Sequence, residues 1–277
     1  MKNIARLTII SFIILTGCSQ PAVTLQPTSQ AIATSTASAT PDVVVDFEKL
    51  EARVPILIYH HIREYRVTDS INDKTFIVSA DELRQQFQYL KDNHFTSITF
   101  KNLVDYFNGQ FNLPEKPVII SFDDGVINQY NNAFDLLKEF DFTATFFIFV
   151  NPIGKSKNYM TWEQLAELRD AGMEIGSHGW YHQYLTRINN DELERELVQS
   201  KNTLEQQLDT KVISIAYPFG DFNEQVATKI QEAGYLTARD IVNGINHRKQ
   251  DLFRLKGYFI TNDFSRFKLI VNKINQY

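Results

Sequence analysis

The chain alternates between short, solidly apolar runs and longer stretches in which apolar residues recur every three or four positions. Each apolar run is bounded by polar or turn-forming residues, as is typical of strands buried on both faces. These runs predict strands at residues 54–59, 97–100, 118–122, 144–150, 173–177, 212–217, 235–239 and 253–260. The stretches with helical spacing predict helices that start near residues 79, 103, 133, 161, 189, 223 and 263.

Strands that alternate with helices are typical of a mostly parallel sheet with helices outside it. Seven or eight strand-plus-helix units favour a single α/β barrel, which need not be complete, over an open sheet. In such barrels the active site lies at the carboxyl ends of the strands. Several polar residues stand at predicted strand ends and would therefore meet on one face: His60, His61, Asp123, Asp124, Ser177, His178 and Tyr217.

The first 17 residues have the pattern of a secretory signal peptide. Lys2 and Arg6 form a basic start, and the apolar run at residues 7–15 is too short for a membrane span. The segment from Leu15 to Cys18 resembles the cleavage box of bacterial lipoproteins, in which the cysteine becomes the lipidated first residue. We therefore expect an exported protein, anchored through Cys18 to the bacterial membrane and facing the outside or the periplasm. The alternatives are a plain signal peptide or an incidental thiol.

Composition separates a linker from a folded domain. Residues 18–46 are rich in Ser, Thr, Ala and Pro, which predicts a flexible tether, and residues 47–277 hold enough apolar residues for one domain. Cys18 is the only cysteine, so no disulfide can form within the chain. The net charge is −5 and no basic cluster is present, which argues against a nucleic-acid partner. We expect a monomer.

Two adjacent carboxylates, Asp123 and Asp124, end the apolar run at residues 118–122. Carboxylates in such a place must be neutralised by a proton, a cation or a metal, because unpaired buried charge is too costly for a fold. If one of the two binds a metal, its neighbour lies close enough to the attacking water to act as a general base. The alternative is an ordinary Asp-Gly turn at the end of a strand.

Two further motifs follow predicted strands. His178 and His182 are four residues apart, so both imidazoles can point the same way, and with one carboxylate they would form a metal site with open positions for water and substrate. The alternative is a pair of histidines at the edge of the core. The segment from Tyr217 to Gly220, which includes Pro218 and Phe219, would add a rigid wall and backbone amides that stabilise an oxyanion; the alternative is a proline turn.

These motifs resemble those of the polysaccharide deacetylases, carbohydrate esterase family four. Ser-Phe-Asp-Asp-Gly at residues 121–125 resembles the family's Thr-Phe-Asp-Asp-Gly motif, residues 177–182 resemble its His-x-x-x-His motif, and residues 216–220 resemble its third, groove-forming motif. Residues 54–62 look like the opening strand of the lipoprotein and biofilm-polysaccharide branch. The resemblance covers about residues 54–260. It implies a distorted, incomplete (β/α) barrel and metal-dependent hydrolysis of N-acetyl groups on a glycan.

The resemblance also implies roles for single residues. Asp123 would be the general base, and the Tyr217 amide would help to stabilise the oxyanion. The ligands of a divalent metal, usually zinc with Co²⁺, Ni²⁺ or Mn²⁺ as alternatives, would be Asp124, His178 and His182.

Two departures from the family pattern matter. Ala216 stands where many members have an arginine, so the group that orients the base must come from elsewhere or be absent. Many members carry the acid histidine in a C-terminal Leu-x-His, which residues 252–257 lack. In the branch with an opening Tyr-His the N-terminal histidine is the acid, so we expect His60 in that role, with His61 as second choice.

Three functions remain open at this point. The first is an N-deacetylase for an N-acetylglucosamine polymer, which can be a β-1,6-linked exopolysaccharide, peptidoglycan or a chitin-like glycan. The second is an O-acetyl esterase on xylan or another acetylated polysaccharide, and the third is an inactive glycan-binding lipoprotein. The intact Asp and His set argues against the third, whereas Ala216 keeps it open. We expect residues 63–76 and 151–159 to line the glycan groove, where Tyr65 and Tyr159 would stack on sugars or simply lie at the surface.

Overall fold

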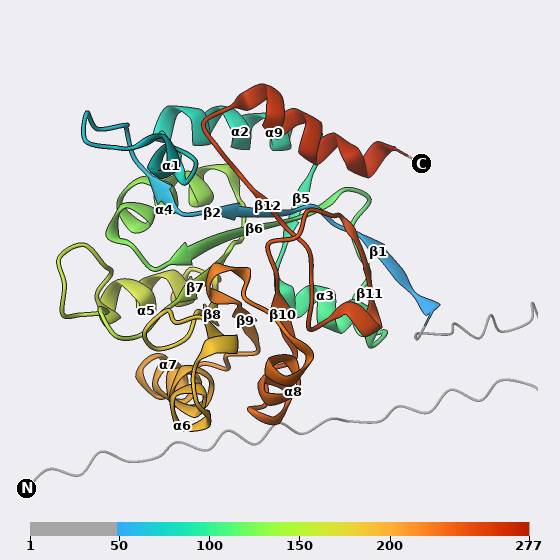
Figure 1. Cartoon of the computed structure of the whole chain (residues 1–277). Coiled ribbons are helices and arrows are strands. Elements are labelled where there is room, and N and C mark those ends of the chain that lie inside the picture. Colours follow the sequence, from blue (N-terminus) through green and yellow to red (C-terminus); the bar gives the residue numbers. More distant parts are fainter. Residues whose placement is uncertain (1–48, 277) are drawn as a thin grey trace, which may run out of the picture. The chain divides into compact units, whose positions relative to one another are not determined.

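A curled parallel sheet runs through the computed structural model, which describes residues 49–276 (Figure 1). Its strands follow the order β12-β2-β6-β7-β8-β9-β10, and β5 pairs with the first residues of β6. The path ends at β12 and β10 without joining them into a closed ladder, so the barrel is incomplete, as predicted. The strands are β2 (Ile56–Tyr59), β5 (Thr96–Ile98), β6 (Pro117–Asp124), β7 (Thr145–Ile148), β8 (Glu174–Ser177), β9 (Ser214–Ala216), β10 (Thr237–Arg239) and β12 (Tyr258–Phe259).

Helices cover the outside of the sheet and begin at capping residues that the sequence indicates. Ser79, Thr161 and Asn189 each accept a hydrogen bond from a backbone N–H in the first turn of the helix that follows. The helices are α1 (Ile71–Lys74), α2 (Ala80–Asp92), α3 (Phe100–Phe107), α4 (Ile127–Phe140), α5 (Trp162–Asp170), α6 (Asn190–Glu194), α7 (Ser200–Leu208), α8 (Glu224–Glu232) and α9 (Phe264–Val271).

Some boundaries differ from the predicted ones. The apolar pattern predicts Phe100 in a strand, but it is the first residue of α3, because Thr99 and Asn102 form a reciprocal capping box. The strand expected at residues 253–260 is reduced to two residues in β12. Short strands not predicted from the apolar pattern form two small ladders: β1 (Glu51–Arg53) with β11 (Asn246–Arg248), and β3 (His61–Ile62) with β4 (Ile77–Val78).

The strand β6 is buried on both faces, as its continuous apolar run predicts. Ile119 and Ile120 belong to two different hydrophobic clusters, one on each side of the sheet. The ring of Phe122 stacks on Phe146 of β7, with centroids 4.9 Å apart, and on Tyr59 of β2, at 5.3 Å. Truncating such a ring to alanine typically costs about 3–5 kcal/mol. This packing gives the two carboxylates that follow Phe122 a rigid support.

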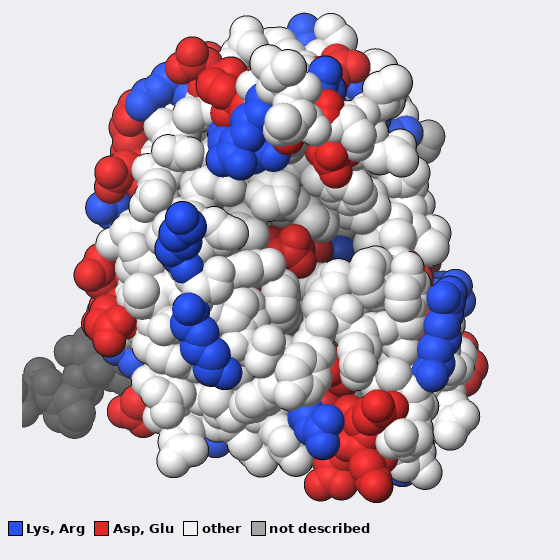
Figure 2. Space-filling model, turned by 60° about the vertical axis from the view of Figure 1, so that its left-hand side comes forward, with Lys and Arg blue, Asp and Glu red and all other residues white. Residues whose placement is uncertain are grey.

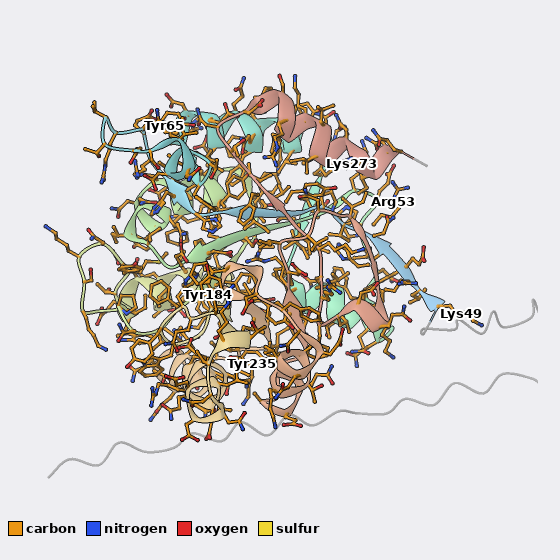
Figure 3. The ribbon with its side chains drawn as sticks, in the orientation of Figure 1. Lys49, Arg53, Tyr65, Tyr184, Tyr235 and Lys273 are labelled. Carbon is orange, nitrogen blue, oxygen red and sulfur yellow. The ribbon has the colours of Figure 1, made fainter. Side chains whose placement is uncertain are left out.

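The ends of the described region are held by a side chain as well as by strands. Arg53 of β1 donates a hydrogen bond to the backbone oxygen of Lys273, beyond α9, and Figure 3 shows the two residues near each other. Within residues 49–276 no helix is both long and apolar enough to cross a bilayer. The predicted signal peptide, Cys18 and the linker lie outside the described residues.

Candidate active site

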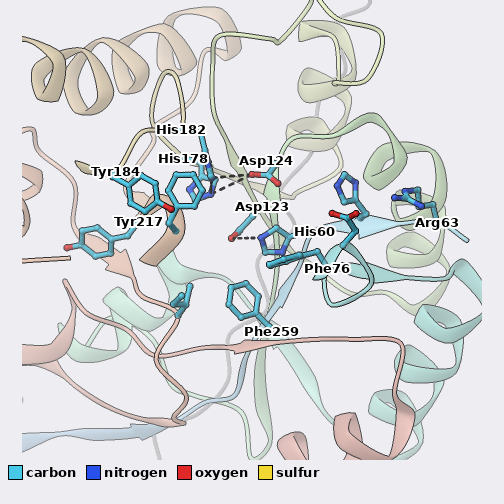
Figure 4. Close-up of a pocket in the computed structure, with 14 residues that line it drawn as sticks. His60, Arg63, Phe76, Asp123, Asp124, His178, His182, Tyr184, Tyr217 and Phe259 are labelled. Atoms are coloured by element: carbon cyan, nitrogen blue, oxygen red, sulfur yellow. Dashed lines mark hydrogen bonds and ion pairs between the residues drawn. The ribbon is translucent and has the colours of Figure 1, made fainter. Parts of the chain in front are cut away.

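The carboxyl ends of the strands surround a cavity of about 520 Å³. Figure 2 shows a hollow in this face of the molecule, with acidic residues inside it and mostly uncharged residues around it. Figure 4 shows side chains from β6, the β2 end and the loop after β8 pointing into the cavity. Most of the predicted site residues line it, from strand ends and from the motifs that follow them: His60, His61, Asp123, Asp124, His178, His182, Tyr217 and Phe219.

One of the two loops expected to line the groove does so. Residues 63–76 contribute Arg63, Asp73 and Phe76 to the cavity wall. Residues 151–159 contribute none of the lining side chains, because Tyr159 turns to pack edge-on against Phe149, with centroids 5.3 Å apart. The loop between β2 and α2 is therefore the one that reaches the cavity.

Asp123 is buried and held by an arginine that the sequence motifs do not reveal. Nη2 of Arg239 lies 2.6 Å from Oδ1 and 2.5 Å from Oδ2 of this carboxylate. Burial, the largest single effect, raises the pKa of Asp123. The charge and hydrogen bonds of Arg239, together with His178 and His60, lower it by more, and the net pKa lies below the usual value. Asp123 is therefore an ionised carboxylate at neutral pH.

Arg239 lies beside Ala216, the position at which many family members carry an arginine. The two residues are direct partners in the parallel ladder of β9 and β10, so their side chains leave the sheet on the same side. Arg239 is 1% exposed, and its guanidinium lies over the ring of Phe147, 5.3 Å from the centroid. The orienting arginine is thus present in this chain, one strand away from where the family pattern puts it. Only the register of two strands could have indicated this.

Asp124 faces away from this ion pair because the backbone turns sharply. Its φ is +80° and that of Gly125 is +73°, both in the left-handed region. Oδ1 of Asp124 lies 3.8 Å from Nε2 of His178 and 3.6 Å from Nε2 of His182. Burial, and then the charge of Asp123, raise the pKa of Asp124 to about 7. A cation beside Asp124 would favour its ionised form.

The two histidines present neutral ring nitrogens to Asp124. Nδ1 of His178 lies 2.8 Å from the carbonyl oxygen of Ala216, so the proton is on Nδ1 and the lone pair of Nε2 is free. This Nε2 lies 3.2 Å from Nε2 of His182. Burial lowers the pKa of His178 to about 4 and that of His182 to about 3. Both rings are therefore uncharged at neutral pH, as metal ligands must be.

This donor set fits a divalent metal. One ligand atom from each of Asp124, His178 and His182 lies within 4.8 Å of the others. Two imidazole nitrogens and one carboxylate oxygen on one side of a cavity are the donors of a catalytic site that keeps positions open for water and substrate. Without a cation, Nε2 of His182 can carry a proton and donate it to Nε2 of His178, and a cation beside both nitrogens would take the place of that proton.

His60 and His61 point to different partners. Nε2 of His60 lies 3.9 Å from Oδ2 of Asp123, and its ring packs between Phe76 and Phe259, at centroid distances of 5.0 and 5.4 Å. Burial lowers the pKa of His60 to about 4. The ring of His61 instead lies with Nδ1 3.2 Å from the Asn128 side chain.

The third motif differs from expectation in one respect. The backbone N–H of Tyr217 donates to the carbonyl oxygen of Arg239 at 3.0 Å, as part of the pairing between β9 and β10. This amide is therefore engaged in the sheet at the edge of the cavity, and its oxyanion role stays a prediction. Phe219 lies at the cavity with φ of +60°, and its ring stacks on Tyr184 at 4.0 Å. Pro218 is buried and does not line the cavity.

This chain is similar in sequence and structure to other proteins. The sequence profile of the family described as polysaccharide deacetylase matches residues 111–238. YxkH of Bacillus subtilis is 28% identical over 204 residues, which cover 74% of this chain and 70% of that protein. The poly-beta-1,6-N-acetyl-D-glucosamine N-deacetylase of Staphylococcus epidermidis is 25% identical over 232 residues, which cover 75% and 78%.

A solved structure agrees with these sequence relatives. The Streptococcus pyogenes deacetylase PplD, in complex with acetate, matches with a TM-score of 0.73 and 26% identity, over 80% of this chain and 98% of that one. The agreement extends over the half-barrel, and the Asp and His motifs predicted the same assignment. These similarities show that the chain belongs to the polysaccharide deacetylase family, carbohydrate esterase family four.

Proposed function

We propose that this protein hydrolyses N-acetyl groups of a polysaccharide that contains N-acetylglucosamine. One observation carries this proposal: a candidate base and a candidate metal site line the same cavity. The base is Asp123, which is ion-paired with Arg239. The metal donors are Asp124, His178 and His182. The name of the Staphylococcus epidermidis relative, a poly-β-1,6-N-acetylglucosamine deacetylase, supports this substrate class. Among glycans of this class, the β-1,6-linked polymer is the first to test.

Asp124, His178 and His182 are the residues that would hold the metal. Zn²⁺ suits two imidazoles and one carboxylate best, and Co²⁺, Ni²⁺ and Mn²⁺ are the alternatives to test. When bound, the metal would polarise the acetyl carbonyl and lower the pKa of the attacking water. Asp123 stays out of this set because Arg239 holds both of its oxygens.

Asp123 is placed to take a proton from water. The water oxygen then adds to the acetyl carbon, and the tetrahedral intermediate carries a negative oxygen. Among the three residues predicted for an oxyanion site, Pro218 has no N–H and the Tyr217 N–H is already bonded in the sheet. Tyr217 and Phe219 both line the cavity, so their amides are the two candidate oxyanion donors.

His60 is placed to supply the proton that the leaving amine needs. Its resting form is neutral, since burial holds its pKa at about 4. The negative charge of the intermediate favours transfer of the proton that Asp123 took from water to the His60 ring, whose Nε2 lies 3.9 Å from Oδ2 of Asp123, and His60 then gives this proton to the amine nitrogen. The carbon–nitrogen bond then breaks, and the products are acetate and a glucosamine residue. The pairing of His61 with Asn128 supports His60 over His61 for this role.

The proposed function is tested with N-acetylglucosamine oligomers of β-1,6 and β-1,4 linkage. We expect the Zn²⁺-loaded protein to release acetate and free amine in equal amounts. Asp123→Asn should keep the metal and lose the activity, whereas Asp124→Asn should lose both. Acetate release only from O-acetylated xylan would show an esterase instead, and glycan binding by a metal-free, inactive protein would show a binding protein.

We also propose that the protein is exported and held at the membrane by a lipid on Cys18. The basic start, the short apolar run and Leu-Thr-Gly-Cys before residue 19 support this proposal. Cys18→Ser should move the protein from the membrane fraction to the soluble exported fraction, without changing acetate release. Unchanged membrane association of the variant would contradict a lipid anchor at this residue.

A further inference from the structure

A buried carboxylate lies beneath the loop that joins His178 to His182. Glu196 is 0% exposed, and its oxygens accept hydrogen bonds from the backbone N–H groups of Trp180, at 2.8 Å, and Tyr181, at 2.9 and 3.1 Å. A buried carboxylate without such donors would cost the fold several kcal/mol. Glu196 is absent from the cavity wall, and no step of the proposed reaction uses it.

The loop is shaped around this carboxylate. A Cβ on Gly179 would lie 2.4 Å from Oε2 of Glu196, so only glycine lets the loop approach so closely. Gly179 has a φ of +82° and His182 a φ of +60°, so the backbone is in the left-handed region at both ends of the short loop. Such a conformation at His182 persists only where the surrounding contacts determine it.

A π turn presents Glu196 to the loop. The apolar pattern predicted one continuous helix from residue 189, but residues Arg195–Gln199 form a π turn between α6 and α7. Hydroxyl groups satisfy the backbone oxygens that this wider turn exposes: Ser200 Oγ donates to the oxygen of Glu196, and the Tyr235 hydroxyl donates to that of Leu197 at 2.9 Å. Figure 3 shows Tyr235 in this region, close to α6 and α7. Such turns occur often at functional sites.

The same network reaches the strand end that carries His178. Ser200 Oγ lies 3.1 Å from Ser177 Oγ, and Ser177 Oγ accepts the N–H of Gly179 at 3.2 Å. The π turn is thus joined to both ends of the segment that contains the histidines. The segment cannot shift without breaking several buried hydrogen bonds at once.

We propose that Glu196 is a positioning residue for the metal site. By holding the N–H groups of Trp180 and Tyr181, it keeps Nε2 of His182 facing Nε2 of His178, 3.2 Å away. The proposal rests on the proposed metal role of the histidines. Partners that orient ligands in this way typically change metal affinity by about 10- to 100-fold.

The test compares Glu196→Gln with Glu194→Gln, a control at an exposed position in the same helical stretch. The glutamine has one acceptor oxygen and turns a donor NH₂ group toward the loop. We expect metal-free Glu196→Gln to bind Zn²⁺ about 10- to 100-fold more weakly than wild type in competition with a chelator. The absorption spectrum of bound Co²⁺ should change, and the amides of Trp180 and Tyr181 should exchange hydrogen faster. The control should match wild type.

The outcomes separate this inference from the proposed function. If wild type binds neither Zn²⁺ nor Co²⁺, the proposed metal site itself fails. If wild type binds Zn²⁺ and Glu196→Gln binds it equally well with an unchanged Co²⁺ spectrum, Glu196 has only a structural role and the inference is overturned. Should Glu196→Gln not fold, Gly179→Ala provides the second test, because its methyl group forces the loop away from Oε2. Unchanged Zn²⁺ affinity in that folded variant would also overturn the inference.

Discussion

Arg239 controls the charge of the proposed base. Removing the guanidinium in Arg239→Met should raise the pKa of Asp123. Burial raises this pKa, and only His178 and His60, whose effects are weaker than that of Arg239, would still lower it. The acid limb of the kcat/KM profile should move to higher pH, and kcat at neutral pH should fall at least about tenfold. A profile whose acid limb stays in place would contradict this role.

Arg239→Met should also change how the free energy of unfolding depends on pH. In wild type the pKa of Asp123 is depressed, so the pair stabilises the fold above the pKa of an unfolded aspartate, and this contribution is lost as the pH falls through the folded pKa. A buried carboxylate without its partner typically costs about 3–5 kcal/mol. Arg239→Met should therefore be least stable, relative to wild type, at neutral pH and above, as urea unfolding at several pH values would show.

Moving the arginine from β10 to β9 tests whether Asp123 needs a guanidinium at position 239 or only a positive charge nearby. Ala216 and Arg239 are ladder partners, so Ala216→Arg combined with Arg239→Ala places a guanidinium next to its original site. We expect the double variant to be at least about tenfold more active than Arg239→Ala alone. Equal activity of the two would show that only the β10 position can hold Asp123.

His60 and His61 are adjacent but have different surroundings. His60→Ala should lower kcat by about 10²- to 10⁴-fold, since a positioned acid contributes that much, and should leave the zinc content near normal. His61→Ala should change kcat by no more than a few fold, because its ring lies against Asn128. Both variants are checked by acetate release and metal analysis. Full activity of His60→Ala would show that the acid is another group.

At the scale of elements, α4 holds two strand ends together. The amide of Gln129 donates to the backbone oxygens of His60, at 2.7 Å, and of Asp123. Gln129→Leu leaves both buried oxygens without this donor, so we expect a loss of about 1–3 kcal/mol in urea unfolding, together with a lower kcat. Asn131→Ala, at an exposed position of the same helix, should stay within about 0.5 kcal/mol of wild type.

The elements also explain which site residues the sequence could predict. Solid apolar runs identify buried parallel strands, and the ends of such strands converge, so Asp123, Asp124 and His178 could be placed together in advance. Arg239 could not, because its role depends on strand register. The hydrogen bond of the Tyr217 amide could not be predicted for the same reason, since it depends on the neighbouring strand.

Glu196 illustrates a second limit of sequence patterns. The apolar residues along α6 and α7 keep the spacing of one continuous helix, and a π turn within it changes that spacing too little to be noticed. A buried glutamate in such a pattern resembles any charged helix residue. Only the three-dimensional contact with the loop after His178 separates it from the exposed Glu194.

At the scale of the whole molecule, the metal should link activity to stability. A ligand that binds only the folded state at a concentration 100-fold above its Kd stabilises that state by about 2.7 kcal/mol. Dialysis against a chelator should therefore lower Tm and abolish acetate release, and Zn²⁺ should restore both. Asp124→Asn should show no rise in Tm with Zn²⁺. A normal Zn²⁺-dependent rise in this variant would mean that the metal binds elsewhere.

The ion pair between Asp123 and Arg239 joins residues 116 positions apart in the chain. During synthesis the proposed metal ligands, the last of which is His182, emerge well before β10 carries Arg239 into place. A chain that ends before β10 holds all three proposed metal ligands, but its base lacks a counter-ion. The proposed base therefore gains its counter-ion only after β10 has joined the sheet, so its charge is set late in the assembly of the fold.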